Sequence, residues 1–293
     1  MPIVINTNLA SLQTQRNITN ASDALSRSME RLASGLRINR ASDDAAGMGL
    51  ALRMTGQIRS LGQAARNTMD GISLLQVAEG AYNEIGNILV RLRELAVQSA
   101  NGTLSTADRT TLQVSADRLI QEISGIANST QFNGVVLLNN TAGNTIVLQV
   151  GMGTVSYTVA ATDQIAVTLY SLTASSFTSS NLDLTGGVDQ IVLTSASNAL
   201  AAIATLDTVI TNLNLSRSMI GAAQNGLESR SRNQTITIEN LTAARSRIQD
   251  VDVAQETSEM VRSQILVQAG TSVLAQANQL PSLALTLLGG GGQ

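Results

Sequence analysis

Residues that could carry catalytic chemistry are scarce in this chain of 293 residues. Histidine and cysteine are absent, and all 18 basic side chains are arginine because the sequence contains no lysine. These absences exclude a Ser-His-Asp triad, a cysteine nucleophile, a histidine-ligated zinc ion and a lysine base. Only a mechanism built on carboxylates stays open. We therefore expect neither an enzyme nor a bound cofactor or metal.

Charge and hydropathy limit the partners of the chain. The formal net charge is -3 and no basic patch stands out, so we expect no nucleic-acid binding. No run reaches the roughly 20 apolar residues that cross a bilayer, so we expect no membrane insertion. Residues 1–10 lack the charged and apolar regions of a signal peptide, which predicts that any secretion occurs without a cleaved signal.

The elements that hold these residues are predicted to be long, thin helices. Aromatic residues make up 2% of the chain, and its two prolines, Pro2 and Pro281, lie near the ends. Small aliphatic residues suit narrow helical seams better than thick cores, and nothing between the prolines breaks a helix as strongly.

The first predicted helix runs from Asn6 to about Arg37 and is capped by Asn6 or Thr7. Gly35 and the polar residues 39–44 interrupt it. Its apolar residues recur at helical spacing and form a stripe that includes Ile18 and Ala21. Six residues of this stripe are candidates for assembly contacts, namely Leu9, Leu12, Leu25, Met29, Leu32 and Leu36.

A second helix is predicted from about Ala45 to Ser99. Its apolar stripe alternates three and four residues, with one skip after Leu75 that resembles a coiled-coil stammer. Asn101 and Gly102 end it, and Ser105 with Asp108 forms a capping box for a third helix to about Asn128.

The middle of the chain favours β-structure. Residues 145–150, 154–159 and 165–170 are rich in β-branched side chains, and Gly151-Met152-Gly153 predicts a hairpin turn. Residues 171–185 are about half Ser and Thr, which indicates a linker or, alternatively, an O-glycosylated surface.

Helix is predicted again from about Ser195. Seven residues recur there at a constant interval of seven, which predicts a left-handed supercoil. They are Leu206, Leu213, Ile220, Leu227, Gln234, Leu241 and Ile248. The polar residues 229–234 predict a joint, and Pro281 is expected to stop the stripe before a Gly-rich tail. The later stripe supplies four further candidates for assembly contacts, namely Ile265, Leu266, Val273 and Leu274.

We therefore predict a mainly α fold in which long antiparallel coiled-coil-like helices from both chain ends flank a small central region containing a β-hairpin. Residues 1–42 and 245–293 would form a terminal helical domain, and 43–244 a rigid helical domain with a short β region at about 135–190. Each terminal stripe is too thin to fold alone. We expect both ends to be disordered in a free monomer and to order on assembly.

Several segments, in order, closely resemble bacterial flagellin. The resemblance covers about residues 1–138 and 195–288. The matching segments are 5–12 (INTNLASL), 31–39 (RLASGLRIN), 43–47 (DDAAG), 91–99 (RLRELAVQS), 131–134 (QFNG), 239–241 (ENL), 248–252 (IQDVD) and 276–281 (QANQLP).

That resemblance implies a structural subunit that self-assembles into the extracellular filament of the bacterial flagellum. It also implies hook-associated and cap proteins as partners, a cytosolic export chaperone, and release through the flagellar type III exporter. The middle of this chain is short, which argues against a large outer domain. The glycine-rich end at 289–293 runs past the usual family terminus.

The resemblance further implies contact with a Toll-like innate receptor through Arg91, Glu94 and Leu95. The alternative is that these residues serve filament packing alone. Counted back from Gln131, a family position that is acidic in well-recognised members is Ser115 here, which weakens the expectation.

Three alternative functions fit the sequence less well. A hook–filament junction protein shares the terminal motifs, but the nearly complete segments at both ends favour a filament subunit. A secreted helical adhesin or translocator would need recognition features in the middle, where only a short Ser/Thr-rich stretch occurs. A metallopeptidase insertion would need an H-E-x-x-H zinc motif, which a chain without histidine cannot supply.

Overall fold

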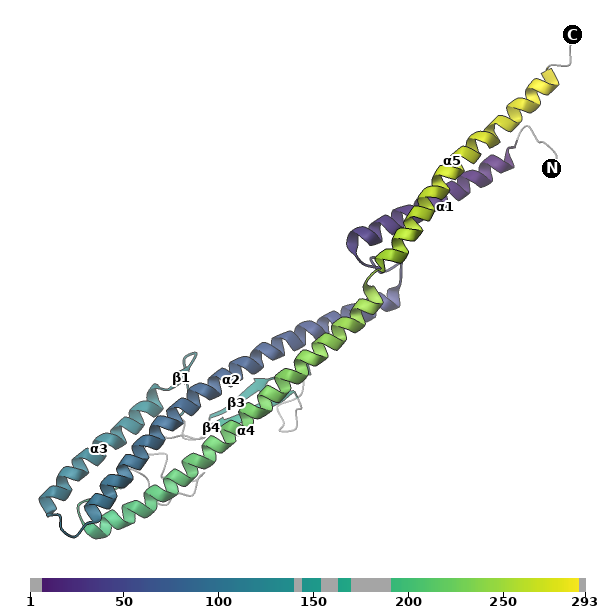
Figure 1. The fold of residues 1–293 in the computed structure, drawn as a ribbon. Helices are drawn as coiled ribbons and strands as arrows, with labels where there is room; N and C mark the ends of the chain where they lie inside the picture. Colours follow the sequence, from purple (N-terminus) through teal and green to yellow (C-terminus); the bar gives the residue numbers. More distant parts are fainter. Residues whose placement is uncertain (1–6, 140–143, 154–162, 170–190, 290–293) are drawn as a thin grey trace. The chain divides into compact units, whose positions relative to one another are not determined.

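The computed structural model describes residues 7–139, 144–153, 163–169 and 191–289, and these are mainly helical (Figure 1). The expected mainly α fold with a small β region is confirmed. The elements are α1 Leu9–Ser34, α2 Ala45–Ala100, α3 Thr106–Ser129, β1 Gln131–Phe132, β2 Val135–Val136, β3 Asn144–Gln149, β4 Gln164–Leu169, α4 Ala196–Gln249 and α5 Val253–Gly289.

The chain divides into two compact units, and α2 and α4 contribute residues to both. The terminal unit comprises Met1–Gly56 and Asn240–Gln293, and the central unit comprises Gln57–Glu239. In the terminal unit α1 and α5 lie side by side and antiparallel (Figure 1). Helices from the two ends of the chain therefore pack together, as the sequence predicts.

The central unit is built on an unbroken seam along α2. From Leu61 to Ser99 one row of its buried residues has members alternately three and four apart, passing through Ala64, Thr68, Gly71, Leu75 and Ala78. The predicted skip after Leu75 is therefore wrong. It arose because the stripe was drawn through Ala65 and Ile72, which are only half buried, whereas their neighbours Ala64 and Gly71 occupy the seam.

The seven-residue repeat of α4 supplies the facing surface. Leu206, Leu213, Ile220, Leu227 and Gln234 are all buried, and all but Gln234 belong to one core cluster that α2 and α3 also line. The predicted joint at 229–234 is wrong, since α4 runs through it without a break. Part of α4 is long and apolar enough to cross a bilayer, a property that it shares with the core helices of soluble proteins.

The strands β3 and β4 pair antiparallel, with Asn144 opposite Leu169 and Gln149 opposite Gln164. The described partner of β3 is thus β4, not a strand directly after Gly151–Gly153. Residues 154–159 lie outside the described residues, as do the Ser/Thr-rich stretch 171–185 and the tail after 289. Asp163 closes the base of this ribbon, since its carboxylate accepts a hydrogen bond of 2.6 Å from the backbone N–H of Gly153.

The ribbon is fastened to the helices by buried polar contacts. Gln234 donates a hydrogen bond of 2.5 Å to the carbonyl oxygen of Val150, and Asn67 donates one of 3.0 Å to that of Gln149. Leu148 lies over Gly71, where a Cβ would come within 2.4 Å of its Cδ1. The polar residue that interrupts the apolar repeat of α4 is therefore the residue that holds the ribbon.

Helix ends follow local chemistry in most places. The predicted capping box of α3 is confirmed, with Ser105 and Asp108 each bonding the other's backbone N–H. Gly35 ends α1 in the left-handed conformation at φ 71°, which favours glycine. The cap of α1 is Asn8, not Asn6 or Thr7, because its side chain accepts a hydrogen bond from the N–H of Ser11.

One predicted helix end is wrong. We expected Pro281 to stop the last helix, yet α5 continues to Gly289. Residues 282–288 read Ser-Leu-Ala-Leu-Thr-Leu-Leu, which is rich in helix-forming residues. A proline costs about 3 kcal/mol inside a helix and can kink it without ending it.

Candidate assembly surface

The seam between α1 and α5 is made largely of small side chains. Positions three and four apart turn toward the partner helix and are buried or half buried. In α1 these are Ser11, Thr14, Ile18, Ala21, Leu25, Ser28 and Leu32, and in α5 they are Glu256, Met260, Ser263, Val267, Gly270, Leu274 and Ala277. Half of these residues are Gly, Ala, Ser or Thr, so the seam is narrow.

A narrow seam brings the two backbones close together. Cα atoms of α1 and α5 approach within 8 Å along the pair, whereas those of α2, α3 and α4 rarely do so with one another. The cores of α2 and α4 contain Leu, Ile and Tyr, which hold helices further apart. The terminal pair is thus closely packed and buries little apolar side-chain area.

The larger apolar side chains of the pair lie on its outside. The exposed fraction is 72% for Leu9, 53% for Leu12, 58% for Ile265 and 53% for Leu266, and Met29 and Val273 are about half exposed. Of the ten candidates from the sequence, only Leu25, Leu32, Leu36 and Leu274 are half buried. The described part of the chain therefore leaves six of them without cover.

Two shallow grooves lie among these exposed residues. One runs along α5 and is lined by Val261, Arg262, Ile265 and Leu266, with Thr257 and Ser258 at one end. The other runs along α1 beside Leu9, Leu12 and Arg16. Apolar side chains left exposed along a groove are a feature that protein interfaces share.

Polar contacts fix the two ends of the pair. At one end Asn8 donates a hydrogen bond of 2.8 Å to the carbonyl oxygen of Ala277, and Ser11 donates one of 2.8 Å to Asn278. At the other end a guanidinium nitrogen of Arg31 lies 3.7 Å from a carboxylate oxygen of Glu256, whose side chain is 12% exposed. These contacts span the length of the pair.

The turns that leave α1 and α4 are tied together. The backbone N–H of Arg37 donates a hydrogen bond of 2.7 Å to the carbonyl oxygen of Gln249, and that of Val251 donates one of 3.1 Å to Gly35. Nearby, backbone N–H groups of Arg40 and Asn39 bond the carboxylate of Asp43 and lower its pKa. The interruption at 35–44 is thus an ordered turn.

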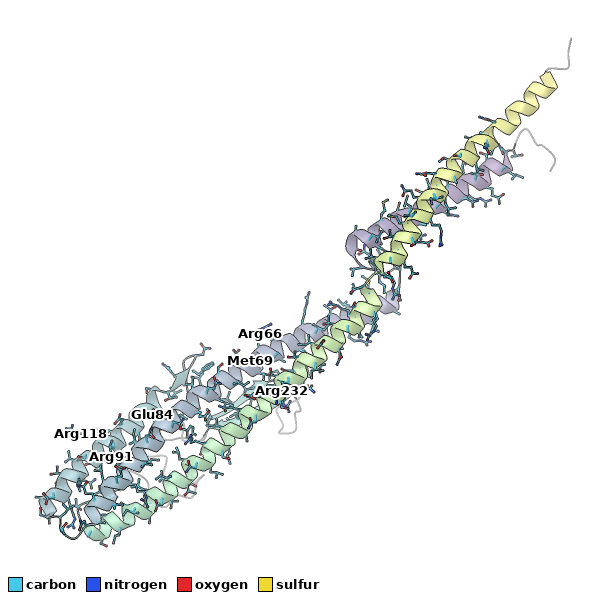
Figure 2. All side chains as sticks on the ribbon, in the orientation of Figure 1. Arg66, Met69, Glu84, Arg91, Arg118 and Arg232 are labelled. Atoms are coloured by element: carbon cyan, nitrogen blue, oxygen red, sulfur yellow. The ribbon has the colours of Figure 1, made fainter. Side chains whose placement is uncertain are left out.

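The expected receptor residues occupy different environments. Arg91 lies on α2 (Figure 2). It and Glu94 are exposed and form an ion pair of 2.5 Å. Leu95 is 7% exposed and belongs to the core cluster, so its side chain is not presented at the surface. Ser115, on α3, is exposed.

Sequence reasoning missed the small residues of the seam. Ser28, Ser263 and Gly270 carry no strong apolar signal, so the stripes were drawn through larger neighbours such as Met29 and Leu266. The signal that could have found them is the regular alternation of three and four continued through Ala, Ser and Gly. Among the described residues no group of three or more Asp or Glu could hold a metal ion.

Comparison with known proteins agrees with this architecture. A family model described as the bacterial flagellin N-terminal helical region matches residues 5–143, and one described as the bacterial flagellin C-terminal helical region matches residues 203–288. Together they cover α1 to α5 except the beginning of α4 and the last residue of α5.

Two curated relatives match almost end to end. A flagellin from Halalkalibacterium halodurans is 42% identical over 286 residues, covering 98% of this chain and 100% of the relative. A flagellar filament 33 kDa core protein from Treponema phagedenis is 40% identical over 291 residues, covering 98% of this chain and 100% of the relative.

A solved structure shares the fold at lower identity. It is described as a flagellar hook-associated protein from Vibrio parahaemolyticus, and it aligns with a TM-score of 0.57 over 71% of this chain and 100% of its own. Its sequence identity is 17%, so the likeness concerns the fold alone.

Proposed function

The chain belongs to the bacterial flagellin family, and from that premise we propose that its copies join through the outward apolar face of the α1–α5 pair. It is a structural subunit of the flagellar filament, outside the cell, and nothing favours the hook–filament junction alternative. Filament assembly requires each subunit to present surface that only another copy covers.

The observation that carries this proposal is the inverted distribution of side chains in the terminal pair. Ser28, Ser263 and Gly270 face the seam, whereas Leu9, Ile265 and Leu266 face outward. Fully burying one leucine contributes about 1.5–3 kcal/mol. Several such residues per copy supply a driving force for assembly that the isolated chain does not use. The half-buried Leu25, Leu32, Leu36 and Leu274 would support the same surface from within.

Substitution of Leu266 tests the proposal. We expect Leu266→Asn to raise the subunit concentration needed for polymerisation at least about tenfold, because it removes apolar burial between copies. Leu266→Met keeps the apolar character and should polymerise like the parent. Sedimentation and electron microscopy of seeded samples measure both. If Leu266→Asn polymerised like Leu266→Met, this face would not be the assembly surface.

Ordering of the chain ends would accompany assembly. We place the filament-core domain at residues 1–42 and 245–293 and the surrounding domain at 43–244. The seam between α1 and α5 is too narrow to offset the ordering entropy of both helices, about 1–2 kcal/mol per residue. The ends would therefore be disordered in the free monomer and become helical when neighbouring copies cover their outward faces.

The remaining partners follow from family membership. We propose that the chain leaves the cell through the flagellar type III exporter without a cleaved signal, with a cytosolic chaperone on its C-terminal region, and that cap and hook-associated proteins contact the filament. Its role would be mechanical and not catalytic, without cofactor, nucleic acid or membrane insertion.

Contact with a Toll-like innate receptor would rest on the exposed Arg91 and Glu94. Leu95 would act through packing, since it is buried. Because Leu95→Ala would disturb the core, the sharper test is Arg91→Ala with Glu94→Ala, compared with Arg118→Ala on α3. Undiminished receptor signalling by the double variant would reject this contact.

A further inference from the structure

Ile18 occupies the space that a side chain at position 270 would need. A Cβ on Gly270 would lie 2.6 Å from Cγ1, 3.3 Å from Cδ1 and 3.9 Å from Cβ of Ile18. At Gly49 and Gly56, which are helical glycines of the same unit, a Cβ would meet nothing within 4 Å. A Cβ on Gly47, near the start of α2, would meet Asp44 and Ile38 of the preceding turn. Among these four glycines Gly270 is therefore the one whose missing side chain is filled from a partner helix.

The seven-residue spacing extends this contact along the antiparallel pair. Seven residues further along α1 and seven back along α5, Leu25 stands opposite Ser263. Half a repeat away the sizes reverse, and Ala21 stands opposite Val267. Each of these three levels thus sets a larger residue against a smaller one, which is how a narrow seam reaches the close packing of a protein interior.

Neighbouring registers fail for identifiable reasons. A shift of seven residues one way sets Ile18 against Ser263 and Leu25 against Glu256, whose carboxylate loses Arg31. The opposite shift sets Ile18 against Ala277 and carries Glu256 beyond the end of α1. In both cases a Cβ stands where Ile18 requires open space, and overpacking of this kind is destabilising.

We propose that Ile18 and Gly270 are the positioning residues that set the register of the α1–α5 pair. Their contact fixes the level along the pair at which the outward residues of α1 stand beside those of α5. The two grooves beside Leu12 and Leu266 come into a fixed relation only in this register. The inference rests on the proposed function, because the relative position of the two grooves matters only when other copies of the chain dock on both.

Disulfide cross-linking tests the register directly. The Cβ separation of 3.9 Å lies within the 3.5–4.5 Å that a disulfide requires, and the chain contains no cysteine of its own. In assembled filaments the variant Ile18→Cys/Gly270→Cys should form an intrachain cross-link under mild oxidation. The pair Ile18→Cys/Ser263→Cys, one repeat away, should not. Equal cross-linking of both pairs, or cross-linking of the second alone, would overturn the proposal.

Substitution at Gly270 tests the consequence for assembly. Gly270→Ala should raise the critical concentration for polymerisation about tenfold, although alanine favours helix more than glycine does. Gly49→Ala makes the same change in open space and should leave polymerisation unaltered. Ile18→Ala/Gly270→Val conserves the number of side-chain carbons and should recover polymerisation to within about threefold of the parent. If Gly270 acted only by weakening its helix, Gly270→Ala would polymerise at a lower subunit concentration than the parent.

The two proposals fail in different ways. If Gly270→Ala polymerised like the parent, the register role would be wrong, whereas the Leu266 variants would still decide the assembly surface. Circular dichroism of the soluble subunits distinguishes both failures from misfolding. None of these substitutions lies in the core of the central unit, so this unit should unfold at an unchanged temperature.

Discussion

Arg93 and Asp207 join α2 to α4 through a pair of hydrogen bonds, and we expect protonation of Asp207 to make the central unit sensitive to acid. The guanidinium donates bonds of 2.6 and 3.4 Å to the two carboxylate oxygens. These bonds lower the pKa of Asp207 from its ordinary value of 3.8 and raise the pKa of Arg93. Because the folded pKa of Asp207 is depressed, the stability that it contributes is present above pH 3.8 and is lost as the pH falls further.

We expect Asp207→Asn to lower the unfolding temperature of the central unit by about 2 °C at pH 7, since exposed ion pairs contribute little. Between pH 4 and pH 2 the parent should lose this advantage, so the two curves should converge. Thermal unfolding followed by circular dichroism across this range measures the difference. Asp70→Asn, at an exposed aspartate of α2, is the control. A difference that stayed constant down to pH 2 would contradict the assignment.

At the scale of elements, the β3–β4 ribbon depends on Gln234. The side chain is 5% exposed, donates to the carbonyl oxygen of Val150 and lies 3.5 Å from the hydroxyl of Thr68. We expect Gln234→Leu to destabilise the central unit by about 1–3 kcal/mol, because a buried carbonyl group would lose its donor. Urea unfolding measures the change, and faster amide exchange in β3 would locate it.

Thr235→Ala is the matched control for this variant. Thr235 is exposed, and its described hydroxyl bond goes to the carbonyl oxygen of Ser231 in its own helix. If both variants unfolded at the same urea concentration, the bond from Gln234 would not fasten the ribbon.

The same elements show how far sequence reasoning reaches. Helix spans follow from apolar spacing and from local caps, so Ser105 and Gly35 could be assigned from residue type alone. Gln234 could not, because a polar residue inside an apolar repeat looks like a joint until the carbonyl group that it satisfies is known. The partner of β3 was equally hidden, since pairing depends on residues far along the chain and not on the glycines that follow the strand.

The assembly surface, too, could be predicted only in part from the sequence. That Leu9, Leu12, Ile265 and Leu266 belong to apolar stripes is visible in the sequence. Which side of the stripe turns inward is not, because Ser, Ala and Gly score as weakly apolar although they allow the closest approach of two helices. The inward side was therefore assigned to the larger residues, and the small residues of the seam went unnoticed.

At the scale of the whole molecule, the two units have separable tasks. The central unit has its own extensive core, which includes Tyr82, Leu89 and Leu206, whereas the terminal unit has a narrow seam. We expect a chain without residues 1–42 and 245–293 to keep the thermal unfolding of the central unit and to lose polymerisation completely. Limited proteolysis of the full-length monomer should remove the same ends first.

A chain lacking residues 171–185 is the control for this truncation, since it shortens the molecule without touching either helix of the terminal pair. It should polymerise. Monomers whose ends resisted protease as well as the central unit did would contradict the division of tasks.

The small side chains between α1 and α5 also set a limit for protein engineering. Replacing Ser28, Ser263 and Gly270 with leucine would add apolar surface to the pair, which the usual rules of core design favour. At this seam the added side chains have no room, since Ile18 already fills the space beside Gly270. The change would spread the two helices, turn the outer leucines and isoleucine away from their present alignment, and leave a protein that no longer makes fibres. Apolar bulk inside one copy and cohesion among many copies are thus opposed at these three positions.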